Sequence, residues 1–447
     1  MVNINNEYKG EIPIKPGFIN IIEVDALFGR YSYRIEVPHF QNGDISRIAM
    51  LYGDNGTGKT TILKLLHNLL SPSMHRGHRT YITRVPFKSF KVIFSSGTKI
   101  EVKRDKTNLI GAYYLCYEEQ AGMKYEGLIS LNSEGEITYE NTAKQIIQII
   151  GKLGLAVYLL GDDRVLQSDQ FEDIENEGIS ETTSVNIRRD LIRRKNRSTI
   201  SNIRNVELHQ LLDRTERWFR QRSFIASTRG EEESQHIYAR IIETINRIGL
   251  PEAETYEQER TKLISELNEL GKRSNSFQRF GLIPKIDNDR FINSLNNTPA
   301  EELPFVLQVL RSFVNGQKAR LQQIDSLYNQ LNRFINLING FFRDKYIEID
   351  AREGISILVG NGQKLEPENL SSGEKQLLLL FCNVLTSSEE ATLFLIDEPE
   401  ISLNVKWQRK LVDSLIKISG ENKCQFLLAT HSIELLTKHV DQTIKLG

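Results

Sequence analysis

The first 160 residues alternate between short apolar runs and polar turns, which is the pattern of a sheet with a few covering helices. Apolar positions at helical spacing predict helices over 61–70 and 142–152, whereas the polar stretch 71–84 predicts a loop. We predict a buried strand over 48–52 and further strands at 18–24, 33–37, about 90–95, 99–104, 111–117 and 155–160. This part of the chain therefore predicts an α/β fold.

The pattern changes at about residue 168. Residues 168–186 are acidic and rich in Ser and Thr, and they predict a loop. The chain then reads as helical to about residue 340, with few glycines and with apolar residues at helical spacing over 321–341. The segment Gly281–Pro284 predicts a turn between two helical parts. Two arrangements remain open, a compact helical subdomain or a protruding antiparallel coiled coil, and the heptads are too few for long arms.

The strand predicted over 48–52 runs into GDNGTGKTT, a phosphate-binding loop of the form GxxxxGK[ST], and the predicted helix follows it. Backbone N–H groups of such a loop point at phosphate oxygens at a helix N-terminus. Lys59 adds a cation for the β- and γ-phosphates, and Thr60 offers a hydroxyl to Mg²⁺. The sequence therefore predicts an ATP site over Asp54, Asn55, Gly56, Thr57, Gly58, Lys59, Thr60 and Thr61.

A second apolar strand, Leu393–Ile396, ends in Asp397 and Glu398. Acids at the carboxyl end of a strand face the ligand in an open α/β sheet. Asp397 suits Mg²⁺, which prefers carboxylate oxygens, and Glu398 is placed to polarise the attacking water. A strand that ends in an acidic turn would look the same, and the phosphate-binding loop is what favours the catalytic interpretation.

The segment Leu370–Gln376, LSSGEKQ, resembles the signature motif of ABC-type ATPases in the spelling found in SMC and RecF proteins. Ser372 stands where the first signature glycine usually lies. The resemblance implies that Ser371, Ser372, Gly373 and Glu374 contact the γ-phosphate held by a second copy of the chain. His431, which follows the apolar run 426–429, matches the switch histidine of the same family.

Two positions depart from the transporter-type pattern. Asn404 occupies the usual aspartate position of the D-loop. No clear Q-loop glutamine precedes the signature, and the best match is the strand Val157–Arg164, which ends in Asp162, Asp163 and Arg164. We expect these three side chains near the nucleotide, although a polar strand end is an equal alternative.

These motifs divide the chain into three expected segments: an N-terminal ATPase lobe over 1–186 with the phosphate-binding loop, a helical insert over 187–340, and a C-terminal lobe over 341–447 that carries the signature, Asp397, Glu398 and His431. The fold class expected is α/β, an ABC-type P-loop ATPase sheet split by a helical insert. We expect the two lobes to reassemble into one sheet.

Composition adds little that is specific. The 447-residue chain has a net charge of −1, which excludes a general basic field for nucleic acid. Its three cysteines lack metal spacing and predict reduced thiols. The polar start and the absence of a long apolar run predict a cytoplasmic protein without a membrane span. A basic run over 188–197 could contact DNA, form a solvated helix face or pair with the acids before it.

The motifs together resemble the stand-alone ATPases of bacterial anti-phage systems, the AriA family of the PARIS system and the PtuA family of the Septu system. Only 16 residues follow His431, so we expect no nuclease domain like that of the OLD family. The resemblance implies ATP and Mg²⁺ as cofactors, an ATP-sandwich dimer within a higher homo-oligomer, and a separate effector nuclease released by a phage protein trigger. The alternative is a DNA-repair or maintenance ATPase of the RecF/SMC type that binds duplex DNA.

Overall fold

The computed structural model describes residues 16–39, 45–105, 108–120, 122–161, 166–168, 205–228, 253–284, 286–387, 391–420 and 424–447. By compactness the chain forms two units. The first comprises Met1–Asn205 and Ser387–Gly447, and the second is Val206–Thr386. The segment 341–386 thus groups with the helical residues before it.

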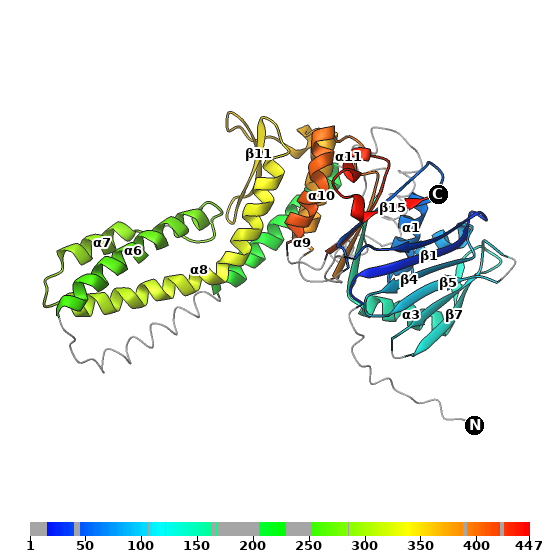
Figure 1. Cartoon of the computed structure of the whole chain (residues 1–447), viewed down its shortest axis with the longest axis horizontal. Coiled ribbons are helices and arrows are strands. Elements are labelled where there is room, and N and C mark those ends of the chain that lie inside the picture. The colour runs from blue at the N-terminus through cyan, green and yellow to red at the C-terminus, as the bar shows by residue number, and fades with distance from the viewer. Residues whose placement is uncertain are drawn as a thin grey trace, which may run out of the picture. The chain divides into compact units, whose positions relative to one another are not determined.

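The first unit contains a six-stranded sheet in the order β10-β9-β13-β14-β3-β15, of which Figure 1 labels the edge strand β15. Four central strands run parallel, and each is rich in buried aliphatic and aromatic residues, as expected where both faces are covered. The strands are β3 (Ile48–Gly53), β9 (Leu155–Leu160), β10 (Leu166–Ser168), β13 (Ala391–Asp397), β14 (Cys424–Thr430) and β15 (Thr443–Leu446). Strands from both ends of the sequence interleave, which confirms the expected reassembly into one sheet.

A second, antiparallel sheet of seven strands has the order β2-β1-β4-β5-β6-β7-β8. Its strands are β1 (Ile19–Leu27), β2 (Tyr31–Glu36), β4 (Ser89–Phe94), β5 (Lys99–Lys103), β6 (Tyr113–Glu118), β7 (Lys124–Leu131) and β8 (Ile137–Tyr139). The sequence did not predict β7 and β8, where polar residues interrupt the apolar alternation. The prediction of a loop over 71–84 was wrong in its second half, because His78–Arg84 forms helix α2.

One apolar core joins the two sheets of the first unit. Helix α1 (Lys59–Leu70) buries six leucine and isoleucine side chains in it, and α3 (Asn141–Lys152) packs on β6 and β7. Arg79, in α2, is fully buried and donates to the carbonyls of Asn68, Leu69 and Ser71, so it satisfies the C-terminal end of α1. The helix that carries the phosphate-binding loop is therefore fixed at its far end.

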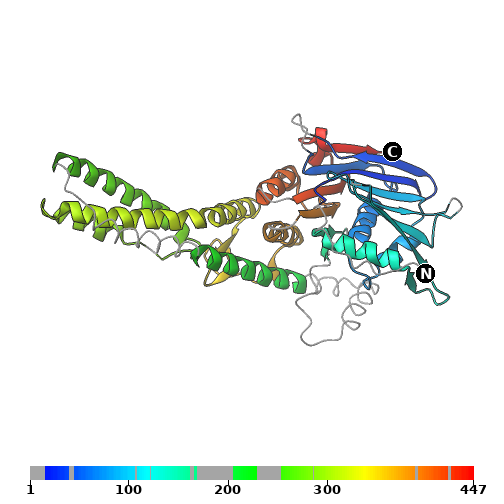
Figure 2. The same ribbon diagram turned by 90° about the horizontal axis from the view of Figure 1, so that it is seen from below.

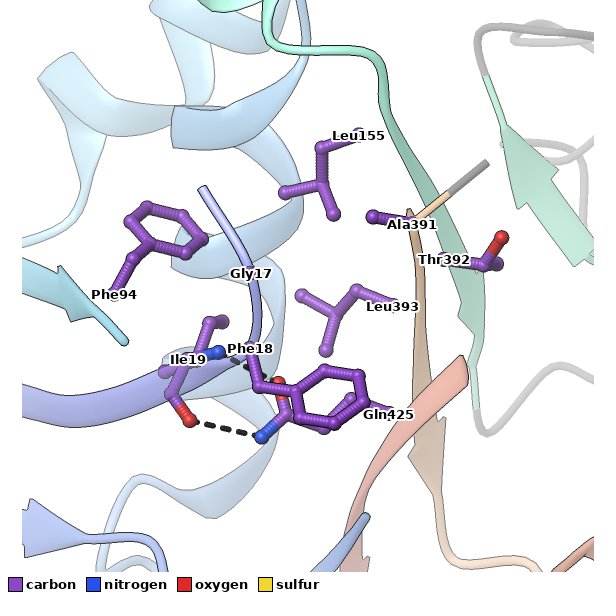
Figure 3. A pocket seen from close by; sticks show the side chains of 9 residues that line it. All are labelled: Gly17, Phe18, Ile19, Phe94, Leu155, Ala391, Thr392, Leu393 and Gln425. Atoms are coloured by element: carbon purple, nitrogen blue, oxygen red, sulfur yellow. Dashed lines mark hydrogen bonds between the residues drawn. The ribbon is translucent and has the colours of Figure 1, made fainter. Parts of the chain in front are cut away.

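Gln425 joins the two sheets through its side-chain amide (Figure 3). Its Oε1 accepts from the backbone N of Ile19 at 2.8 Å, and its Nε2 donates to the Ile19 carbonyl at 2.8 Å. The amide thus satisfies both backbone groups of a residue at the start of β1. Beside it lies a small hollow lined by Phe94, Leu155 and Ala391 among others, which is apolar apart from the Gln425 and Thr392 side chains.

In the second unit, helices α6 (Ala253–Gln278) and α8 (Leu303–Asn339) run side by side, with α7 (Asn288–Asn297) packed against both (Figures 1 and 2). Ion pairs link Glu259 to Arg311, Glu266 to Lys318 and Arg273 to Asp325. All three pairs join residues 52 positions apart, since 311 − 259 is also 52. Within each helix the paired residues recur every seven positions, so α6 and α8 run parallel. The antiparallel arrangement is wrong for these two helices, because α7 returns the chain and allows α6 and α8 to run parallel.

The base of the second unit is built from four elements. A helix covers residues 205–228, the hairpin β11 (Lys345–Asp350) and β12 (Gly354–Val359) follows α8, and α9 (Ser372–Thr386) closes the unit. Asn339, the last residue of α8, pairs with both backbone groups of Ile347 in β11. No helix among the described residues is long and apolar enough to cross a membrane.

We predict that Gln425→Leu destabilises the protein by about 2–4 kcal/mol, because it leaves a buried N–H and a buried carbonyl of Ile19 unpaired. The measurement is the shift in thermal unfolding temperature. Gln167→Leu, at an exposed position of β10, is the matched control and should change little. An equal shift for the two variants would contradict the role given to the amide.

Candidate functional site

The phosphate-binding loop lies between β3 and α1, as its sequence predicts. Gly56 and Gly58 both have positive φ, at 84° and 95°. A Cβ on Gly58 would lie 2.5 Å from Leu27 Cδ2, so a side chain is excluded there by both backbone conformation and space. Asp54, Asn55 and Gly56 are exposed at the tip of the loop.

Lys59, the first residue of α1, is 6% exposed. Its Nζ donates to the carbonyls of Gly53 at 2.8 Å and Asp54 at 2.9 Å. Burial lowers the pKa of Lys59 below its usual value, and the neighbouring carboxylates of Glu398 and Asp397 oppose that shift. The ammonium group therefore lies inside the loop, facing a set of acids.

Thr60 and Asp397 meet although they are 337 positions apart in the sequence. The Thr60 hydroxyl donates to Asp397 Oδ1 at 3.0 Å. Asp397 is the last residue of β13 and is buried. A hydroxyl and a carboxylate at this distance are the hard oxygen ligands that Mg²⁺ takes, so the residues present fit that metal.

Glu398 and His431 follow neighbouring strands. Glu398 comes directly after β13, His431 directly after β14, and the Glu398 backbone N donates to the Ala429 carbonyl at 2.8 Å. Glu398 has φ +46°, a conformation that costs energy for a residue with a side chain. The His431 backbone N donates to Glu400 Oε1 at 2.7 Å. Both predicted catalytic residues thus lie at the edge of the sheet that holds Lys59 and Asp397.

Three aromatic residues near this edge were not assigned from the sequence. Phe28 has φ +57° and is 44% exposed, and its ring edge would lie 3.4 Å from a Cβ on Gly58. The Tyr33 hydroxyl donates to the Thr57 carbonyl at 3.1 Å. Burial raises the pKa of Tyr81 to about 12, and the charge of Asp397 adds to the shift. In the sequence, the glycine after Phe28 indicates a turn at that position, whereas neither tyrosine gives a signal there.

Ser371, Ser372, Gly373 and Glu374 lie at the start of α9, in the second unit. Ser371 Oγ accepts from the Glu374 backbone N at 3.3 Å, and Glu374 Oε2 accepts from the Ser371 backbone N at 2.7 Å. This reciprocal pair is a capping box, which the spacing Ser-x-x-Glu encodes. Ser371 and Ser372 remain exposed, while Gly373 and Glu374 are buried.

Lys345 of β11 holds the capping glutamate. Its Nζ lies 2.9 Å from Glu374 Oε2, and the two side chains are 22% and 8% exposed. Burial by itself would raise the pKa of Glu374, but the hydrogen bonds from Lys345 and Ser371 outweigh it and hold that pKa below the usual value. The start of the signature helix is therefore tied to the hairpin that follows α8.

Asn404 serves as a helix cap, since its side chain accepts from the Trp407 backbone N at 3.0 Å at the start of α10 (Val405–Ser419). Asp162, Asp163, Arg164 and the basic run 188–197 lie outside the described residues.

A family model described as "AAA domain, putative AbiEii toxin, Type IV TA system" matches residues 166–437, which is more than half of the chain. The match includes the signature, Asp397, Glu398 and His431, and it begins after the phosphate-binding loop.

Curated relatives match shorter segments. A putative ABC transporter ATP-binding protein of Bacillus thuringiensis subsp. konkukian is 39% identical over 80 residues, which is 18% of this chain and 14% of that protein. A putative ABC transporter ATP-binding protein of Clostridium acetobutylicum is 28% identical over 112 residues, which is 25% of this chain and 39% of that protein. The chain thus matches well under half the length of these relatives.

Among solved structures, the chain is similar to the Smc head domain of Pyrococcus furiosus bound to the C-terminal domain of ScpA, with 12% identity and a TM-score of 0.38 over 94% of this chain and 91% of that one. The SMC head domain of Thermotoga maritima gives 13% identity and a TM-score of 0.30 over the same shares.

We predict that Glu374→Gln destabilises the second unit by about 1 kcal/mol at pH 7, because it weakens the helix cap. The pKa of Glu374 is lowered in the folded state, so its stabilisation is present above 4.5, the value for a free side chain, and is lost as pH falls below it. The difference between wild type and variant in urea unfolding should therefore shrink on acidification. Glu366→Gln, an exposed neighbour, is the control. A difference that stays constant from pH 7 to pH 3.5 would show that the charge does not contribute.

Proposed function

The chain belongs to the family described as an AAA domain, putative AbiEii toxin, of a type IV TA system, and we propose that it binds and hydrolyses Mg²⁺-ATP as one half of a composite site. The observation that carries the proposal is the contact of Thr60 with Asp397 at 3.0 Å beside the phosphate-binding loop. The match to ABC-type ATP-binding proteins supports the same activity at a coarser level.

Each site residue in the first unit has a defined role in this proposal. Backbone N–H groups of the loop 54–61 bind the phosphates, and Lys59 neutralises charge on the β- and γ-phosphates. Thr60 and Asp397 hold Mg²⁺, which neutralises phosphate charge when bound. Glu398 orients and polarises the attacking water, and His431 contacts the γ-phosphate. The exposed ring of Phe28 stacks on the adenine ring of the nucleotide.

The signature of a second copy completes the site. Ser371 and Ser372 are exposed at the N-terminus of the 15-residue helix α9, and such an end favours an anion. The capping box and Lys345 hold this end in place. We propose that these residues contact the γ-phosphate bound by a partner copy, so that ATP joins two chains and a larger homo-oligomer is built from such pairs.

In this proposal, the nucleotide state of the ATPase controls another protein. Asp397 binds the Mg²⁺ of the nucleotide and Glu398 orients the attacking water, so neither carboxylate is available for a second reaction. The family description names a putative toxin of a type IV TA system, which supports a role beyond ATP hydrolysis alone. We propose that the chain acts in the cytoplasm as a sensor and scaffold that holds an effector nuclease and releases it when a phage protein binds.

We predict that Glu398→Gln binds ATP with wild-type affinity but lowers kcat at least 100-fold. The glutamine amide has the shape of the glutamate side chain but cannot act as the general base. The variant should form an ATP-dependent dimer in size-exclusion chromatography, and adding Ser371→Arg should abolish that dimer. Lys59→Ala is the control without nucleotide binding, which calorimetry with an ATP analogue measures. Wild-type turnover in Glu398→Gln would refute the assignment of the base.

A second experiment tests the output. Co-expression with the neighbouring gene should yield a complex of the two products, and ATP should change its composition in wild type but not in Lys59→Ala. The purified chain alone should leave DNA intact. If no neighbouring product associates in any nucleotide state, the sensor-scaffold proposal fails; salt-sensitive binding of duplex DNA in the same preparation would then favour the DNA-maintenance alternative.

A further inference from the structure

Two turns emerge side by side at the catalytic edge of the six-stranded sheet. β13 and β14 pair in parallel as far as Asp397 and Ala429, and the chain then leaves each strand in a turn. The acidic turn, Glu398–Leu403, carries the proposed base, and the switch turn, Thr430–Ser432, carries the proposed γ-phosphate contact. Relative placement of Glu398 and His431 therefore depends on what joins these turns.

The acidic turn is strained at two residues. Glu398 has φ +46° and Ser402 has φ +68°, and neither is glycine. Among the described residues, two backbone bonds close the turn, from Ile401 N to the Glu398 carbonyl and from Leu403 N to the Glu400 carbonyl. A conformation of this kind persists when its surroundings hold it, and it is often found where function requires it.

Glu400 makes the first side-chain link between the turns. Its Oε1 accepts from the His431 backbone N at 2.7 Å, a short hydrogen bond to a charged acceptor. In the described part of the chain its second oxygen, Oε2, is buried and makes no hydrogen bond, so one bond carries the contact. The carboxylate also acts on the pKa of Lys59, which places it within the field of the phosphate site.

Gln408 of α10 makes the second link. Its Oε1 accepts from the Ser432 hydroxyl at 2.7 Å, and its Nε2 donates to the Leu403 carbonyl at 2.8 Å and, more weakly, to the Glu400 carbonyl at 3.4 Å. The Ser432 hydroxyl in turn caps α11 (Ile433–Leu436). One amide thus bridges the end of the acidic turn and the residue after His431.

A third contact, the ion pair of Arg409 with Glu434, lies at the surface, where the side chains are 56% and 35% exposed. Exposed ion pairs contribute little, because water screens them and both side chains lose rotamer freedom. Glu400 and Gln408 are therefore the links on which the arrangement depends, and Arg409 offers a matched control in the residue next to Gln408.

We propose that Glu400 and Gln408 are positioning residues that latch the switch turn to the acidic turn, so that His431 and Glu398 take up their catalytic positions together. The latch rests on the proposed ATPase function for its effect on rate. It acts by accepting and donating hydrogen bonds at fixed places, and Glu400 needs no charge for this task. A base or a metal ligand at position 400 would need the carboxylate.

Four variants test the latch through steady-state ATP hydrolysis. Glu400→Ala and Gln408→Met should each lower kcat at least tenfold, with KM within threefold of wild type. Glu400→Gln, which still offers an oxygen to the His431 N–H, should retain kcat within threefold. Arg409→Ala should match wild type. The double variant Glu400→Ala with His431→Ala should lose less kcat than the product of the two single losses, because part of the effect of Glu400 passes through His431.

Hydrogen exchange of the segment 428–434 provides a readout independent of turnover. The His431 amide should exchange faster in Glu400→Ala and Gln408→Met than in wild type, and at the wild-type rate in Glu400→Gln. Equal loss of kcat in Glu400→Gln and Glu400→Ala would overturn the latch, as would a change in KM alone or unchanged exchange. If wild type hydrolyses no ATP, the proposed function fails, while the exchange data still decide whether the latch exists.

Discussion

The structure depends on the parallel pairing of β14 between β3 and β13. This pairing brings together the ends of three strands that are far apart in sequence, so that the phosphate-binding loop, the acids Asp397 and Glu398, and His431 share one edge of a sheet. A site built at the ends of paired strands is held more precisely than one built on loops alone. The buried, mostly aliphatic strands and the Gln425 amide that docks β1 onto β14 hold this arrangement in place.

The strained backbone conformations and the side-chain contacts that hold them lie outside the strands. Glu398 and Ser402 have unfavourable backbone conformations, and hydrogen bonds from neighbouring elements hold the turn that contains them. In the second unit, the signature helix starts with a capping box tied to Lys345, the first residue of the strand that follows α8. Both parts of the proposed composite site are thus held by side chains outside the motifs themselves.

Much of this could be predicted from the sequence, because the motifs follow buried strands whose apolar runs are easy to recognise. The phosphate-binding loop, β13 and the sheet formed by strands from both ends of the sequence were predicted for that reason. The parallel packing of α6 and α8 was missed, since heptad spacing does not encode direction when a short helix can return the chain. The roles of Gln425, Glu400 and Gln408 were invisible for a different reason: each depends on a contact between distant residues, and a single polar side chain gives no signal in the sequence.

The central claim is that Thr60 and Asp397 hold the metal of a bound nucleotide at this edge. A structure of the Glu398→Gln variant with ATP and Mg²⁺ tests it most directly. The account predicts a metal ion about 2.1 Å from Thr60 Oγ1, with Asp397 bound directly or through a water, and the phosphates in the loop 54–61. A nucleotide bound elsewhere, or a metal held by other residues, would contradict it.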